Sequence, residues 1–214
     1  MTSIADAVVF DMDGVLIDSG VHHREAWIAM CRDCGVTPPP EFWRLTIGRP
    51  AEEAAALLVH GAGPAEARRL AALKRDHYMR LARRGMLPVP GAPAFVAALA
   101  RRSVPRAVAT SASRRDVETL LTEIGVRQHF TVIVSVENVR QGKPDPEVYL
   151  KAAEGLGVDA EACLVFEDAI VGVYAARAAG MRVIGVTTAH TAEELVAAGA
   201  ERAVPHFEEV RWPV

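Results

Sequence analysis

This sequence has few cysteines, no long apolar run and no excess of basic charge. Its 214 residues include three cysteines, an odd number that argues against a disulfide framework. No apolar run approaches the roughly 18 residues that a membrane-spanning helix needs, and the N-terminus lacks the basic start of a signal peptide. The net charge of −3 offers no broad basic field to nucleic acid or anionic lipid. We therefore expect a soluble, cytoplasmic protein without nucleic-acid or membrane partners, either a monomer or a weak homodimer.

Two of the cysteines, Cys31 and Cys34, form a C-x-x-C pair near the end of a predicted amphipathic helix that Gly35 caps. Thiols three residues apart share one face of a helix. A structural zinc site would need two further ligands at suitable spacing, and none is evident in the sequence. We interpret the pair as free thiols, with a metal or redox role as the alternative.

Short apolar runs alternate with helical patterns through most of the chain. The predicted strands are residues 7–10, 107–109, 131–134, 163–166 and 182–186. The predicted helices between the later strands are residues 92–101, 114–124, 146–156 and 171–179. Strands that alternate with helices indicate βαβ units and a parallel sheet covered on both faces. Right-handed crossovers then give a doubly wound, Rossmann-like α/β core.

Residues 19–87 interrupt this alternation with helical patterns alone, at 22–34, 51–60 and 65–84. Because this stretch begins just after the first strand, it should lie over the carboxyl ends of the strands, where such sheets bind ligands. We expect a core of residues 1–18 and 88–214 and an inserted, all-helical cap of residues 19–87. The two crossing segments are natural hinges for a lid that excludes water.

Carboxylates follow two of the predicted strands directly. Asp11 and Asp13 come after the first, and Gly14 lets the chain turn sharply there. One carboxylate can attack phosphorus while the other serves as general acid and base, although capping of local backbone groups is the simpler alternative. Glu167 and Asp168 follow a later strand, where they could also cap the next helix. Four carboxylates converging at one sheet edge would repel one another unless a cation such as Mg²⁺ lay among them.

Donors for a phosphate group occur in two other segments. Thr110 and Ser111 follow a strand and, with Ala112, lead into a helix that begins near Arg114. Their hydroxyl groups and the backbone N–H groups of that helix start would form an anion cradle. Lys143 lies between a glycine and a proline, in a loop rigid enough to direct its ammonium at a phosphoryl oxygen.

Together these segments closely resemble the four motifs of the haloacid dehalogenase superfamily. They read DMDGVLIDS at 11–19, TS at 110–111, GKPDP at 142–146 and FED at 166–168, and ARAAGM at 176–181 extends the last as in the β-phosphoglucomutase-like branch. The resemblance implies a Rossmann-like core, a helical cap inserted after the first motif, and dependence on Mg²⁺.

The same resemblance implies a role for each motif residue. Asp11 would be the nucleophile, and Asp13 the general acid and base with its backbone carbonyl on the metal. Thr110 or Ser111, together with Lys143, would hold the phosphate. The metal ligands would be Asp11, Asp13, Glu167 and Asp168.

The presence of Asp13 favours phosphoryl transfer, because dehalogenases of this superfamily lack the second aspartate. We expect a phosphatase of a small phosphorylated metabolite, such as a sugar phosphate. A phosphosugar mutase is the alternative: His23 and Trp27 fall where β-phosphoglucomutase has a histidine and a tryptophan. However, residues 46–51 lack the lysine before the glycine and the later arginine that would grip a distal phosphate. Arg49 is the nearest substitute, and we include it with His23 among the candidate substrate-binding residues. A non-enzymatic phosphate-binding domain is a more remote alternative.

Overall fold

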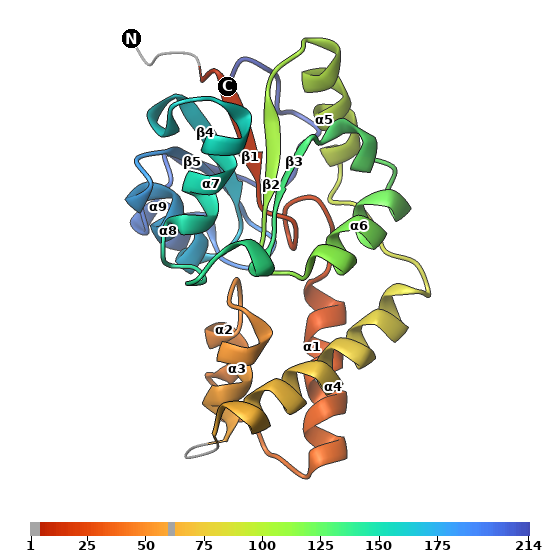
Figure 1. Cartoon of the computed structure of the whole chain (residues 1–214). Coiled ribbons are helices and arrows are strands. Elements are labelled where there is room, and N and C mark those ends of the chain that lie inside the picture. Colours follow the sequence, from red (N-terminus) through yellow and green to blue (C-terminus); the bar gives the residue numbers. More distant parts are fainter. Residues whose placement is uncertain (1–4, 60–62) are drawn as a thin grey trace.

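The centre of the molecule is a six-stranded parallel sheet in the order β3-β2-β1-β4-β5-β6 (Figure 1). The computed structural model describes residues 5–59 and 63–214. The strands are β1 (Ala7–Phe10), β2 (Arg106–Ala109), β3 (Val132–Val134), β4 (Cys163–Glu167), β5 (Arg182–Val186) and β6 (Arg202–Val204). The chain runs outward from β1 to β3 and then, on the other side, from β4 to β6. The strand order therefore reverses between β1 and β4, the point at which doubly wound sheets bind their ligands.

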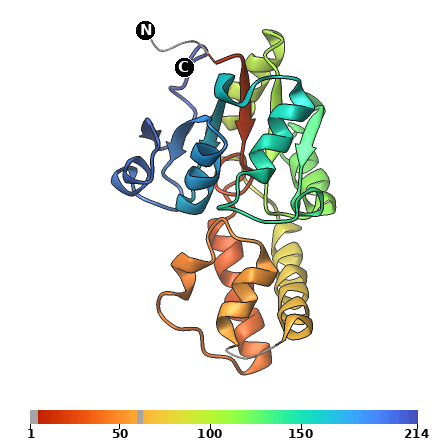
Figure 2. The same ribbon diagram turned by 60° about the vertical axis from the view of Figure 1, so that its left-hand side comes forward.

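Helices cover both faces of this sheet, which confirms the doubly wound, Rossmann-like fold (Figures 1 and 2). Side chains alternate along each strand, so Val8 and Phe10 face one layer while Ala7 and Val9 face the other. The first layer contains α5 (Ala92–Arg101) and α6 (Arg114–Glu123). The second contains α7 (Glu147–Leu156), α8 (Ile170–Ala178) and α9 (Ala192–Ala197).

An aromatic cluster fixes the ends of the two central strands. The ring of Phe10 stacks on that of Phe166, with centroids 5.5 Å apart. Phe95 meets both rings edge-on, and Phe207 packs against all three. Because Phe10 and Phe166 are also paired in the sheet, the residues that follow them leave the sheet side by side.

Four further helices lie beyond the carboxyl ends of the strands (Figure 1). They are α1 (Gly20–Cys34), α2 (Phe42–Leu45), α3 (Ala51–Leu58) and α4 (Pro64–Ala82), and we call them the helical insert. They share a hydrophobic core of their own, in which Trp27, Met30, Phe42 and Leu70 are buried. Cys31 is buried in this core and Cys34 is half-buried, both as free thiols.

The two segments that join the helical insert to the sheet run side by side. The amide of Asp18 donates a hydrogen bond to Leu87 O (2.9 Å), and the amide of Val89 donates one to Leu16 O (3.1 Å). Both chain crossings therefore lie at one place, where the sequence predicted hinges. None of the helices in the described parts of the chain is both long enough and apolar enough to cross a membrane.

The sequence prediction matched the five strands and the long helices but omitted one strand, two short α-helices and three single-turn 3-10 helices. β6 is an edge strand of three residues that begins with an exposed arginine, so it lacks the apolar run that indicates a buried strand. The helices α2 and α9 have four and six residues, too few to show a helical period. The helix predicted over 51–60 ends at Leu58, and its last predicted residue, His60, lies outside the described residues.

Candidate active site

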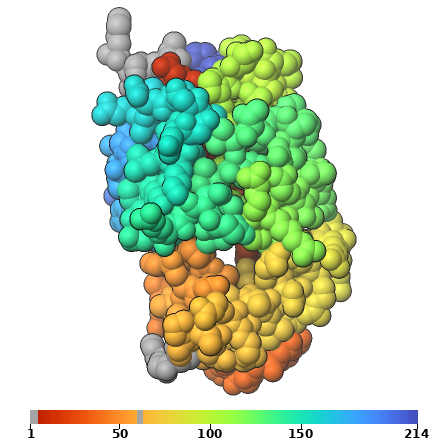
Figure 3. All heavy atoms as spheres, viewed as in Figure 1, coloured from red at the N-terminus to blue at the C-terminus, as the bar shows by residue number. Residues whose placement is uncertain are grey.

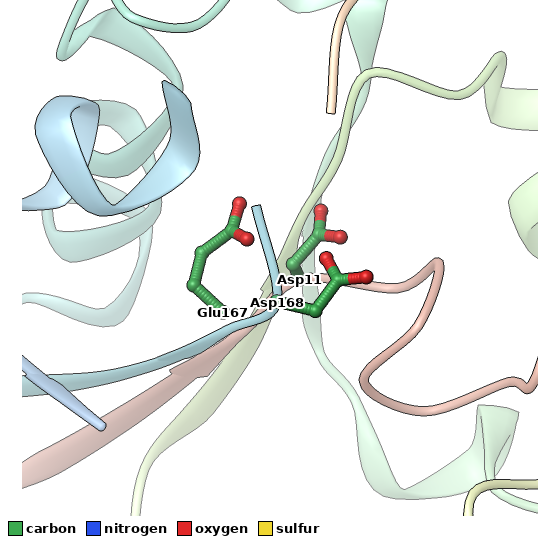
Figure 4. Close-up of side chains that lie close together, drawn as sticks. All are labelled: Asp11, Glu167 and Asp168. Carbon is green, nitrogen blue, oxygen red and sulfur yellow. The ribbon is translucent and has the colours of Figure 1, made fainter. Parts of the chain in front are cut away.

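Three buried carboxylates meet at the carboxyl ends of β1 and β4 (Figure 4). Asp11, Glu167 and Asp168 each offer an oxygen, and these oxygens all lie within 4.8 Å of one another. The arrangement follows from the sheet, because Phe10 pairs with Phe166 and the amide of Asp11 donates to Phe166 O (3.0 Å). The sequence predicted that four carboxylates converge here. The structure brings three of them together, whereas the side chain of Asp13 bonds to His23 and Tyr78 instead.

Lys143 lies between two of these carboxylates and is itself buried. Its Nζ donates to Asp11 Oδ1 (2.8 Å) and to Glu167 Oε1 (2.6 Å). The hydroxyl of Tyr149 also donates to Glu167 Oε1 (3.1 Å), and the amide of Ala169 donates to Glu167 Oε2 (2.7 Å). Glu167 is therefore held by three donors, whereas Asp11 keeps its second oxygen, Oδ2, free of protein donors in the described part of the chain.

The crowding of these groups shifts their acidities. Burial, together with the carboxylates of Glu167 and Asp13, raises the pKa of Asp11 to about 7 against the opposing effect of Lys143. Burial and the carboxylates of Glu167 and Asp11 likewise raise the pKa of Asp168 well above its usual range. Burial alone would lower the pKa of Lys143, but Asp11 and Glu167 outweigh it and keep Lys143 protonated. The single lysine balances only part of the charge of the three carboxylates. Their oxygen atoms are the ligands that a hard divalent cation prefers, so the residues present fit such an ion.

Two glycines make room for this cluster. Gly14 has a φ of +72°, and a Cβ at this position would lie 1.9 Å from Asp168 Oδ2. A Cβ on Gly172, in the first turn of α8, would lie 1.6 Å from Glu167 Oε1. Neither position accommodates a side chain unless a carboxylate moves, which explains why Gly14 belongs to the site.

Asp13 lies outside the carboxylate cluster and is held by the helical insert. His23 Nε2 is 2.9 Å from Asp13 Oδ1, and the hydroxyl of Tyr78 donates to the same oxygen (3.3 Å). The rings of His23 and Tyr78 stack with centroids 4.2 Å apart. On the far side of the imidazole, the buried Lys74 places Nζ 2.6 Å from His23 Nδ1.

These contacts fix the protonation of the group. An ammonium only donates, so His23 Nδ1 accepts from Lys74, and the imidazole proton is on Nε2, directed at Asp13. Burial and Lys74 lower the pKa of His23, so the ring is neutral at pH 7. Burial alone would raise the pKa of Asp13, but His23 and Lys74 outweigh it and lower the pKa, which leaves Asp13 as a carboxylate. Burial lowers the pKa of Lys74 to about 8, despite the opposing effect of Asp13.

The predicted phosphate donors lie at the start of α6, facing the same space. Thr110 is buried, and its Oγ1 accepts from the amide of Ala112 (3.1 Å). The hydroxyl proton of Thr110 has no acceptor among residues 5–59 and 63–214, whereas Ser111 donates to Gly48 O of the helical insert (3.0 Å). In this conformation Thr110 is thus the hydroxyl left available to a ligand.

A cavity of about 910 Å³ lies between the sheet and the helical insert, and Figure 3 shows an opening between these two parts. The predicted residues that line it are Asp11, Asp13, Gly14, His23, Arg49, Thr110, Ser111, Ala112 and Asp168. Lys143 and Glu167 lie behind Asp11 and do not line the cavity. Among the cationic lining residues, Arg75 pairs with the buried Asp116. Arg49 lies close enough to Glu53 to oppose, without cancelling, the rise in the pKa of Glu53 that burial causes.

Sequence reasoning missed several residues that take part in this site. Lys74 and Tyr78 are one helical turn apart on α4, as His23 and Trp27 are on α1, and the two pairs face each other. Their spacing was a signal that each pair shares a helix face. It could not reveal that these two faces meet at Asp13.

The fold and the site define a doubly wound α/β protein with a buried cluster of three carboxylates at its topological switch point. The sequence model of one family, described as haloacid dehalogenase-like hydrolase, matches residues 5–180. This match covers more than half of the 214 residues. The chain therefore belongs to this family of hydrolases.

Similar proteins agree with this assignment. The validoxylamine A 7'-phosphate phosphatase of Streptomyces hygroscopicus subsp. limoneus is 37% identical over 205 residues, which cover 96% of this chain and 95% of that protein. The fructose-1-phosphate phosphatase YqaB of Escherichia coli K12 is 31% identical over 180 residues, or 84% and 95% of the two chains. The crystal structure of β-phosphoglucomutase from Clostridium difficile has a TM-score of 0.85 at 23% identity, covers 98% and 94% of the two chains, and shows a common fold.

Proposed function

We propose that this protein is a Mg²⁺-dependent phosphatase of a small phosphorylated metabolite, a sugar phosphate or a similar compound. The observation that carries the proposal is the geometry around Asp11, which has one oxygen bonded to a buried lysine and one oxygen free in a cavity. The similarity to the validoxylamine A 7'-phosphate and fructose-1-phosphate phosphatases supports the reaction and the substrate class.

In this proposal Asp11 is the nucleophile. Lys143 holds Oδ1, so Oδ2 attacks phosphorus, the bond from phosphorus to the ester oxygen breaks, and an aspartyl-phosphate forms. Thr110, with the backbone N–H groups at the start of α6, binds the phosphoryl oxygens. Asp11 and Asp168, with Glu167 and the backbone carbonyl of Asp13, would hold Mg²⁺, which when bound neutralises charge on the phosphoryl group.

Asp13 is the proposed general acid and base. It gives a proton to the departing ester oxygen and later takes one from the water that attacks the aspartyl-phosphate, which releases phosphate and restores Asp11. The hydrogen bonds from His23 and Tyr78 stabilise the carboxylate form, which is the form required for the second step. For the first step Asp13 must gain a proton as the substrate binds.

We also propose that residues 19–87 act as a cap domain over a core of residues 1–18 and 88–214. Ser111 bonds to the insert at Gly48, and the insert residue Arg75 bonds to Asp116 of α6. These contacts support a closed arrangement in which the cap covers the cavity and excludes water during phosphoryl transfer.

The test is a panel of sugar phosphates incubated with the protein and Mg²⁺, with release of inorganic phosphate as the readout. We expect turnover by the wild-type protein and none by Asp11→Asn, which keeps the shape of the side chain. Removal of Mg²⁺ with EDTA should also abolish release. Turnover by Asp11→Asn at the wild-type rate would rule out the covalent route.

A phosphosugar mutase is the second candidate, and the contact of His23 with Asp13 favours it, since a histidine at this position is a point of resemblance to β-phosphoglucomutase. The two candidates differ in their products. Incubation with β-glucose 1-phosphate and a bisphosphate primer should give inorganic phosphate if the protein is a phosphatase. Glucose 6-phosphate without net release of phosphate would establish the mutase.

A further inference from the structure

The segment that follows β5 makes two hydrogen bonds to Asp168 that the proposed mechanism does not use. Thr188 Oγ1 lies 3.2 Å from Asp168 Oδ2 and 2.6 Å from Gly14 O. The buried His190 places Nδ1 2.9 Å from the backbone oxygen of Asp168. A carbonyl oxygen only accepts, so Nδ1 carries the proton and donates it.

The position of these residues follows from the sheet. β4 and β5 are paired, with Glu167 opposite Gly185, so the chain that leaves β5 passes directly beside Asp168. Thr188 is exposed at the edge of the cavity that Asp168 also lines. Its hydroxyl has one proton, which it can donate either to Gly14 O or to Asp168 Oδ2, so it lies within reach of both the turn after β1 and the carboxylate after β4.

Asp168 depends on these hydrogen bonds because it has no ion pair in the described part of the chain. Lys143 orients Asp11 and Glu167 directly, at 2.8 and 2.6 Å. The side chain of Asp168 instead has Thr188 as its hydrogen-bond partner, and its backbone has His190. Gly14 also lies beside this carboxylate, where a Cβ would come within 1.9 Å of Oδ2.

We propose that Thr188 and His190 are positioning residues that hold Asp168 in the orientation required to bind the divalent cation. The inference rests on the proposed function, because it assumes that Asp168 is a metal ligand. Groups that hydrogen-bond to a ligating carboxylate fix its geometry, and loss of such a partner typically weakens metal binding about 10- to 100-fold. Neither residue would touch the substrate or the metal.

The test measures binding of Mn²⁺ alone, as a spectroscopic substitute for Mg²⁺, by electron paramagnetic resonance of the free ion in the absence of substrate. We expect Thr188→Val, which removes only the hydroxyl, to raise the Kd for Mn²⁺ about 10- to 100-fold, whereas Thr188→Ser stays within about threefold. His190→Leu should weaken binding similarly. His190→Asn should recover much of the loss, because its amide N–H takes the place of Nδ1–H. Thr187→Val is the matched control, since it makes the same change in the neighbouring residue.

A second readout separates positioning from general structural damage. The kcat of Thr188→Val should return to near the wild-type value at saturating Mg²⁺, with its thermal unfolding midpoint unchanged. A Kd for Mn²⁺ equal to that of the wild type in both Thr188→Val and His190→Leu would overturn the inference and leave the proposed function intact. Failure of the wild-type protein itself to bind Mn²⁺ would instead overturn the metal site, and the inference with it.

Discussion

The carboxylate of Asp11 should destabilise the metal-free protein, so that Asp11→Asn yields an inactive but more stable variant. Burial is the largest cause of the rise in the pKa of Asp11 from 3.8 to about 7. Because each tenfold change in acidity corresponds to 1.36 kcal/mol, the ionised carboxylate costs the folded state about 4 kcal/mol at pH 8. Between pH 3.8 and 7 the folded protein binds more protons than the unfolded chain, so its stability falls as the pH rises.

The expected gain for Asp11→Asn at pH 8 is about 2 to 4 kcal/mol, since the amide avoids the net cost of the buried charge, in which the attraction to Lys143 is already counted. This gain requires that Asp11 be ionised in the folded wild-type protein, so it depends on pH. The difference in the free energy of unfolding between variant and wild type should therefore shrink by about 2 to 3 kcal/mol from pH 8 to pH 5.

The assay is urea unfolding in EDTA from pH 5 to pH 8, followed by both tryptophan fluorescence and circular dichroism. The control is Asp6→Asn, which makes the same change at an exposed aspartate just before β1. Addition of Mg²⁺ at pH 8 should stabilise the wild-type protein by mass action and stabilise Asp11→Asn much less. A stability difference that does not change with pH would refute the reasoning.

Three further predictions follow from the same contacts. Lys143→Met leaves two buried carboxylates unpaired and should lower the free energy of unfolding in EDTA by about 3 to 5 kcal/mol; a variant as stable as the wild type would contradict this. Arg75 makes two 2.7 Å bonds to the buried Asp116, so a double-mutant cycle with Arg75→Met and Asp116→Asn should give a coupling of about 1 to 3 kcal/mol. The exposed pair of Arg44 with Glu194 should give less than about 1 kcal/mol, and equal couplings would show that burial does not matter here. Finally, burial lowers the pKa of Lys74 to about 8, so kcat/KM should fall as the pH rises through 8, because the cavity then loses a cation. The variant Lys74→Met should not show this fall. A fall that persists in the variant would show that another group is responsible.

The part of the site that lies on the sheet could be predicted from sequence, because the carboxyl ends of the strands determine where its residues lie. Asp11, Thr110 and Glu167 each follow an apolar run, and the carboxyl ends of parallel strands necessarily meet at one edge of the sheet. No knowledge of packing was needed to bring these residues together. Lys143 was harder, since it comes from a loop, but the proline and glycine beside it indicated a fixed conformation.

The other half of the site could not be predicted because it depends on how separate elements pack. The spacing of Lys74 and Tyr78 shows that they share a face of α4. It does not show that this face lies beside Asp13. That orientation results from contacts over long sequence distances, such as the bond of Arg75 to Asp116. Thr188 differs in that it lies near the end of a predicted strand, so the rule that located Asp11 could also have located it.

Asp11 and Asp13, two residues apart, have pKa values displaced in opposite directions by different parts of the molecule. The strand ends and the loop of Lys143 surround Asp11, where burial and neighbouring carboxylates raise the pKa to about 7. The hydrogen bonds to the Asp13 carboxylate come from α1 and α4, through His23 and Tyr78, and the interaction with His23 is the main cause of its lowered pKa. A movement of the helical insert away from the sheet would therefore change the acidity of Asp13 while leaving the bond between Asp11 and Lys143 intact. In the proposed mechanism Asp13 is the residue that takes up and releases a proton. The helical insert, which lies over the cavity, would therefore also control the pKa of the proton donor.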